Sequence, residues 1–350
     1  MQFFIVIASL RLLSSAIYAS PILPHNISVD ANALLKTVYQ FPNETWIENI
    51  AVRSNGKLLV TLLFKPEVWQ IDPIENSANL IYSFPDADCT LGIAEYAPDV
   101  FGINVGNSTP AGGVPGAWSV WSLDLSQWRH HGPVIRKSRP QVTARKILDI
   151  TSATFLNGLA APPLAPDVLL SADSGAGLIY RIDTKRSTWD IFLDDLTLKP
   201  NASAVPLLGV NGVQIRDNYL YYDNTFHSPL LARVPFHPTT ATVSGPVEVL
   251  SNTHTYPLNG NNGQADDFTF DQGGNIWLAT ASSSLVKLDL TSKRQTLIAG
   301  EPGSLALVGS TATKFARDGR TLYITTNGGI SDPVNGIEGG KVFSLDTSLL

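Results

Sequence analysis

One phrase recurs along this chain of 350 residues. A polar residue opens a short alternating strand, a turn follows, and a second, strongly apolar strand comes next. Successive copies are about 45 to 65 residues apart, which is the period of a four-stranded propeller blade. The six copies, of which the second is the weakest, begin at Glu48, Leu91, Asn157, Asn211, Asp266 and Thr313.

The strands that follow each copy support the same architecture. Most copies lead into a third strand of the form apolar-x-apolar-Asp, such as Val68–Asp72, and then into a more polar fourth strand. The segment Lys36–Phe41 precedes the first copy and also has strand character. We predict that it pairs with the last blade, because ring closure removes exposed sheet edges. The sequence therefore predicts an all-β, six-bladed β-propeller as a single domain over residues 21–350.

Two other architectures explain the pattern less well. A β-sandwich also has short strands and turns, but it gives no reason for six similar phrases. A parallel α/β sheet needs helical periods between its strands, and almost none occur here. Within the propeller, the Gly- and Pro-rich stretch Gly106–Gly116 is expected to be a loop.

The start of the chain resembles a secretory signal peptide. The apolar run Phe3–Ala8 is followed by further apolar residues and then by small residues up to Ser20. We assign residues 1–20 to a signal peptide and expect a secreted protein, with an apolar N-terminal strand as the alternative. The stretch is too short to span a membrane and contains Arg11, so no membrane attachment is expected after its removal.

The amino-acid composition restricts the classes of partner that we expect for this chain. The chain has 24 basic and 30 acidic residues without long runs of either sign, which excludes nucleic acid as an expected partner. Cys89 is the only cysteine, so no internal disulfide can form. We expect a monomer that acts on a small molecule. Glycosylation is predicted at the sequons of Asn26, Asn43, Asn107 and Asn201.

The residues that open the phrases are the candidates for chemistry. The first strand of each propeller blade lines the central channel, so residues far apart in sequence meet near the axis. Four of the residues that open a phrase would form the catalytic set, namely Glu48, Asn157, Asn211 and Asp266. Three aromatic residues near strand ends would wall the cavity, namely Trp46, Phe155 and Phe226. Each of these residues also has a structural explanation, as a turn residue or as core packing.

The repeat and these four positions, in this order, resemble the senescence marker protein/gluconolactonase family of regucalcin-like propellers. In that family an early Glu, an Asn in an Asn-Gly phrase and a later Asp hold a metal, with a further Asn beside it. The resemblance implies that Glu48, Asn211 and Asp266 are the ligands if Ca²⁺ or another divalent cation is bound, and that Asn157 is accessory. Carboxylate and amide oxygens suit such cations.

The chain departs from the family pattern in two places. Glu48 is followed by Asn-Ile-Ala rather than by Gly-Pro and a Trp, and Asp266 is followed by Asp267 rather than Gly. The segment Trp46–Thr61 instead resembles a fungal secreted branch of these propellers. That branch includes hetero-Diels-Alderases of secondary metabolism, which join a tropolone-type quinone methide to the sesquiterpene humulene.

Three functions remain open from the sequence. In a pericyclase, Asn157 and Asn211 would donate hydrogen bonds to the dienone oxygen, and Glu48 or Asp266 would assist loss of water from a hydroxymethyl precursor. In a metal-dependent lactonase of the gluconolactonase type, the cation would polarise the lactone carbonyl. The third is a non-catalytic secreted propeller that binds a ligand.

Overall fold

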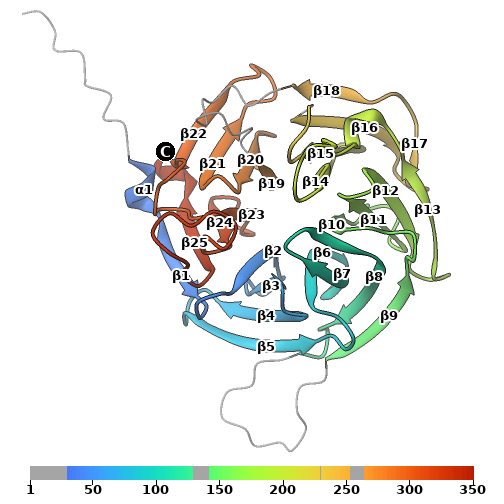
Figure 1. Ribbon diagram of the computed structural model, residues 1–350, viewed down its shortest axis with the longest axis horizontal. Coiled ribbons are helices and arrows are strands. Elements are labelled where there is room, and N and C mark those ends of the chain that lie inside the picture. Colours follow the sequence, from blue (N-terminus) through green and yellow to red (C-terminus); the bar gives the residue numbers. More distant parts are fainter. Residues whose placement is uncertain (1–29, 129–141, 229, 253–263) are drawn as a thin grey trace, which may run out of the picture.

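The computed structural model describes residues 30–128, 142–228, 230–252 and 264–350. The assigned signal peptide and the sequon at Asn26 lie outside this part of the chain and stay predictions. Six antiparallel sheets stand around a common axis, and Figure 1 shows the ring face-on. The chain is therefore the all-β, six-bladed propeller that the repeat predicts.

The first three blades each consist of four strands that follow one another from the axis outward (Figure 1). Blade 1 contains β2 (Trp46–Val52), β3 (Leu58–Leu63), β4 (Glu67–Asp72) and β5 (Ser77–Ser83). Blade 2 contains β6 (Cys89–Ala97), β7 (Val100–Thr109), β8 (Gly112–Asp124) and β9 (Thr143–Asp149). Blade 3 contains β10 (Leu156–Ala160), β11 (Val168–Asp173), β12 (Leu178–Asp183) and β13 (Thr188–Leu193).

The other three blades complete the ring. Blade 4 contains β14 (Val210–Arg216), β15 (Tyr219–Asn224), β16 (Leu231–His237), β17 (Thr242–Val243) and β18 (Glu248–Ser251). Blade 5 contains β19 (Ala265–Phe270), β20 (Ile276–Thr280), β21 (Ser284–Leu288) and β22 (Gln295–Gly300). Blade 6 contains β23 (Ser310–Phe315), β24 (Thr321–Thr326) and β25 (Lys341–Asp346), and β1 (Lys36–Gln40) is its outermost strand.

The predicted closure of the ring is confirmed, because β1 pairs antiparallel with β25 near the other end of the chain. The short helix α1 (Ala31–Leu34) precedes β1, and the 3₁₀ turns η1 (Leu196–Leu198) and η2 (Thr347–Leu349) follow blades 3 and 6. In the described ranges, no helix has the length and apolar character needed to cross a membrane.

The core lies between neighbouring blades. Every residue of β3 is buried, whereas the first four residues of the outer strand β13 are exposed. Blades 2 and 3 meet where Trp118 packs edge-to-face on Phe155, with ring centroids 5.3 Å apart. Full burial of such a large apolar side chain stabilises the fold by about 1.5 to 3 kcal/mol. Packing between blades therefore fixes the ring without any disulfide.

The expectation of a loop over Gly106–Gly116 is wrong. Strand β7 continues to Thr109 and β8 begins at Gly112, so most of the stretch is a hairpin. Its glycines permit close packing rather than a loose loop, because a Cβ on Gly113 would lie 2.2 Å from the Thr154 carbonyl oxygen. The hairpin is thereby pressed against the segment that leads into β10.

Candidate functional site

The innermost strand of every blade is irregular close to its start. The register shifts in β2, β6, β10, β14, β19 and β23, at the same place in each strand. A β-bulge of this kind bends a strand and redirects a side chain. Four of the six shifts span the predicted site residues Glu48, Asn157, Asn211 and Asp266.

These four residues line one cavity of about 450 Å³ at one end of the channel. All four are buried, and they come from blades 1, 3, 4 and 5. The three aromatic residues expected to wall the cavity, Trp46, Phe155 and Phe226, line it as well. The structure therefore brings together all seven residues that the sequence singled out.

Apolar groups dominate the rest of this cavity. Leu63, Phe64 and Leu208 contribute to its wall, and Ile330 comes from the long connection in blade 6. The rim also includes Ser108–Pro110 and Gly112 from the blade 2 hairpin, Val205–Pro206, and Ser331. The hairpin that replaced the expected loop thus has a place at the site. Such a cavity suits a largely hydrophobic ligand with a few polar groups.

The surroundings of Glu48 raise the proton affinity of its carboxyl group. Trp46 Nε1 donates a 2.6 Å hydrogen bond to Glu48 Oε2, so this tryptophan orients the carboxyl group besides walling the cavity. Burial raises the pKa of Glu48 to about 8, the negative charge of Asp267 adds to the rise, and the Trp46 hydrogen bond opposes it. Glu48 therefore keeps its proton at neutral pH.

Asp266 has a similar environment. Burial raises the pKa of Asp266 well above its usual range, and the charges of Glu48, Asp267 and Asp223 raise it further. Asn211 Nδ2 donates to Asp266 Oδ1 at 3.2 Å and to Thr225 Oγ1 at 3.0 Å. Two buried carboxyl groups that influence each other's ionisation in one cavity can act as a proton donor and a proton acceptor.

The two amide side chains present oxygen atoms without partners. Asn157 Oδ1 and Asn211 Oδ1 are buried, and neither has a hydrogen-bond partner among the described residues. Because the Asn211 nitrogen already donates twice, the unused atom of that side chain is an acceptor. The sequence could not reveal this, since a sequence pattern does not show how an amide side chain is oriented.

This donor set fits a divalent cation. Two carboxyl groups and two unpartnered amide oxygens are hard ligands, and a cation among them would relieve the repulsion between Glu48 and Asp266. The described residues contain no group of three or more His, Cys, Asp and Glu side chains arranged to hold a metal ion. Any cation here would therefore depend on the amide oxygens of Asn157 and Asn211.

The next layer of the channel was not anticipated as part of the site. Asn49 and Asp267 follow Glu48 and Asp266 by one residue, and Asn49 Nδ2 donates a hydrogen bond to Asp267 Oδ2 between blades 1 and 5. Burial raises the pKa of Asp267 to about 7, while the charge of Lys314 and the Asn49 hydrogen bond oppose the rise. The sequence did contain a sign of this layer. Asn49 and Asp267 stand at the positions where glycine follows Asn157 and Asn211 in blades 3 and 4.

The asparagines of the remaining sequons do not line the cavity, although Ser108 and Thr109 of the Asn107 sequon do. Asn43 is exposed, Asn201 is partly exposed, and partly exposed Asn107 accepts a hydrogen bond from the Asp88 backbone. Glycosylation at these positions stays a prediction.

The fold and the cavity define a class: a six-bladed propeller with a carboxyl-lined pocket on its axis. Regucalcin from Agrobacterium tumefaciens, a calcium-binding protein, has the same fold, with a TM-score of 0.57 and 16% identity over 88% of this chain and 92% of that one. No protein-family model matches the chain.

Two curated fungal proteins are similar in sequence. One from Phoma sp., named "Putative hetero-Diels-Alderase", is 27% identical, with 83% of this chain and 86% of that protein aligned. Another of that name from Sarocladium schorii is 29% identical, with 54% of this chain and half of that protein aligned. The resemblance inferred from the sequence is thereby confirmed, and the names of these relatives support an enzymatic role.

Proposed function

We propose that the chain is a hetero-Diels-Alderase that joins a tropolone-type quinone methide to a sesquiterpene such as humulene. The observation that carries the proposal is the pairing of two buried carboxyl groups, Glu48 and Asp266, inside a mainly apolar cavity. The names of the two fungal relatives support the same reaction class. Secretion, a monomeric state and glycosylation remain part of the proposal.

The cavity suits the binding part of the task. Its volume of about 450 Å³ lies within the range of about 300 to 1,000 Å³ that holds small ligands. An apolar wall of Leu63, Phe155 and Phe226 would hold a hydrocarbon alkene against the flat diene. Holding both reactants in one orientation lowers the entropic part of the barrier, which is the main requirement of a cycloaddition.

The carboxyl groups suit the step that prepares the diene. Protonated Glu48 gives its proton to the hydroxyl group of a hydroxymethyl precursor, the C–O bond breaks, and water leaves. The Glu48 carboxylate that this leaves then accepts the ring hydroxyl proton, so that the ring electrons form the exocyclic double bond of the quinone methide. The alkene then adds across this diene, and two σ bonds form from π electrons without a further reagent.

Asn157 is the better candidate for a hydrogen bond to the dienone oxygen. The Asn211 nitrogen is occupied by Thr225 and Asp266, whereas no described residue accepts a hydrogen bond from the Asn157 nitrogen. A donor aimed at the oxygen that gains charge stabilises the transition state. Asn211 is then a positioning residue, which holds Asp266.

A metal-dependent lactonase is the second candidate, favoured by the unpartnered oxygens of Asn157 and Asn211. Glu48, Asn157, Asn211 and Asp266 would hold the cation, which when bound would polarise a carbonyl group as a Lewis acid. A non-catalytic binding propeller has no specific observation in its favour beyond the fold.

Turnover with and without chelator separates these candidates. We expect the purified protein, treated with excess EDTA, to convert a hydroxymethyl tropolone and humulene into one stereoisomer of the adduct, measured by chiral chromatography with mass detection. The buffer control without protein should give slow formation of mixed stereoisomers. The proposal fails if the protein neither accelerates nor directs adduct formation. Hydrolysis of aldonolactones that EDTA abolishes would establish the lactonase instead.

A further inference from the structure

A second cavity of about 500 Å³ lies at the other end of the inner strands. Strand β2 shows the separation, because Trp46 and Glu48 line the candidate site whereas Ala51 and Val52 line the second cavity. The two cavities share no lining residue. Aliphatic residues are the most numerous in its lining, with Leu159, Pro163 and Ile215 on one side, while polar atoms form about half of its exposed surface.

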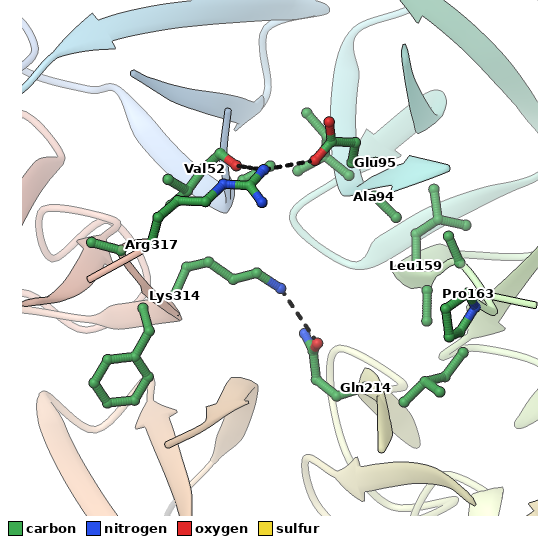
Figure 2. Close-up of a pocket in the computed structure, with 15 residues that line it drawn as sticks. Val52, Ala94, Glu95, Leu159, Pro163, Gln214, Lys314 and Arg317 are labelled. Atoms are coloured by element: carbon green, nitrogen blue, oxygen red, sulfur yellow. Dashed lines mark hydrogen bonds and ion pairs between the residues drawn. The ribbon is translucent and has the colours of Figure 1, made fainter. Parts of the chain in front are cut away.

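Two basic residues from blade 6 extend over this cavity, and they differ in their partners (Figure 2). Arg317 forms an ion pair with Glu95 at 3.1 Å and donates to the Val52 carbonyl oxygen. Lys314 Nζ makes one long hydrogen bond of 3.4 Å to Gln214 Oε1. In the described part of the chain, no carboxylate oxygen lies within 4 Å of Lys314 Nζ.

The surroundings of Lys314 shift its protonation towards the neutral amine. Burial lowers the pKa of Lys314, and the charge of Asp267 behind it opposes this effect only in part. A lysine withdrawn from water in an apolar pocket is the usual form of a nucleophilic amine. The side chain is nevertheless partly exposed, so a small molecule can reach the nitrogen.

The charge of the cavity argues against a carboxylate as its ligand. Arg317 and Glu95 neutralise each other, and Asp267 balances whatever charge Lys314 keeps. An uncharged molecule with an apolar part and one polar atom therefore matches the aliphatic residues and the Lys314 amine better than an anion does.

We propose that this cavity is a second reactive site, in which Lys314 forms an imine with a small apolar aldehyde or ketone. The Nζ lone pair forms the C–N bond, the carbonyl π pair moves to oxygen, and the oxygen takes up a proton. The resulting carbinolamine expels water as the nitrogen loses its remaining proton, which leaves a C=N bond without any oxidant or reductant. This site does not depend on the cycloaddition proposed at the opposite end.

Reductive trapping tests the proposal on the full chain. Limiting benzaldehyde with sodium cyanoborohydride at about pH 7.5 should alkylate Lys314 several-fold more than Lys287 or Lys341, because burial lowers the pKa of Lys314 whereas the other two lysines are held in ion pairs. Peptide mass spectrometry locates the benzyl group. The variant Lys314→Arg should lose only this modification, and circular dichroism should confirm that it is folded.

The specificity of trapping separates a binding site from an exposed amine. Benzaldehyde should outcompete the polar glycolaldehyde at Lys314 but not at Lys287 or Lys341, because only Lys314 lies in the aliphatic cavity. Labelling of Lys314 no faster than the other two lysines would overturn the proposal. Equal rates for the two aldehydes at Lys314 would overturn it as well.

Discussion

Replacing Glu48 by glutamine should lower the rate of adduct formation from the hydroxymethyl precursor by about 100-fold or more. Glutamine has nearly the same size and can still accept the hydrogen bond from Trp46 Nε1, so the cavity should keep its shape. It has no proton to give to the leaving hydroxyl group. The measurement is the single-turnover rate with saturating humulene.

The matched control for this change is Glu67→Gln. Glu67 accepts a hydrogen bond from Trp69 Nε1 at 2.8 Å, the same Trp–Glu arrangement two residues apart, but it does not line the cavity. The control should keep nearly full activity. When a preformed quinone methide replaces the precursor, Glu48→Gln should recover most of its rate. If Glu48→Gln and Glu67→Gln turned over the precursor equally fast, Glu48 would have no part in proton transfer.

Replacing Gly158 by alanine should destabilise the protein by about 3 kcal/mol, the upper end of the cost of overpacking. Gly158 is buried within the register shift of β10, and a Cβ there would lie 2.4 Å from the Asn211 carbonyl oxygen. That neighbour is backbone and cannot rotate away, so β10 and β14 must move apart. The measurement is the midpoint of urea unfolding.

Gly273→Ala is the control for this prediction. A Cβ on Gly273 would lie 3.3 Å or more from the nearest atoms, which are the ends of the Asp271 and Asn275 side chains. Its cost should stay below about 1 kcal/mol. If the Gly158→Ala protein were as stable as the Gly273→Ala protein, the inner strands β10 and β14 could not be in the close contact that their bulges require.

The architecture could be predicted from the sequence because each blade repeats the same local pattern. A phrase such as Glu48–Thr61 specifies two strands and the turn between them, and six copies leave a closed ring as the simplest arrangement. The meeting of Glu48 with Asp266, which are far apart in the chain, then follows from ring geometry rather than from any local signal.

Other features could not be predicted because they depend on packing between blades. The Gly and Pro content around Thr109–Gly112 is typical of a loop. A hairpin forms there because contact with the next blade stabilises its strand pairing. The occupied nitrogen of Asn211 and the pairing of Asn49 with Asp267 arise only when the bulges face one another. Local patterns carry no information about such distant contacts.

The pH dependence of unfolding tests the buried carboxyl cluster most directly. The pKa of Glu48 is raised from 4.5 to about 8 in the folded protein, so between these values the unfolded state loses a proton that the folded state keeps. Unfolding free energy, measured with EDTA present, should therefore fall by on the order of a few kcal/mol from pH 5 to pH 8. Glu48→Gln should reduce this fall, with the remainder due to the raised pKa values of Asp266 and Asp267, whereas Glu67→Gln should leave it unchanged. A free energy equally dependent on pH in all three proteins would contradict the placement of Glu48 beside Asp266 and Asp267.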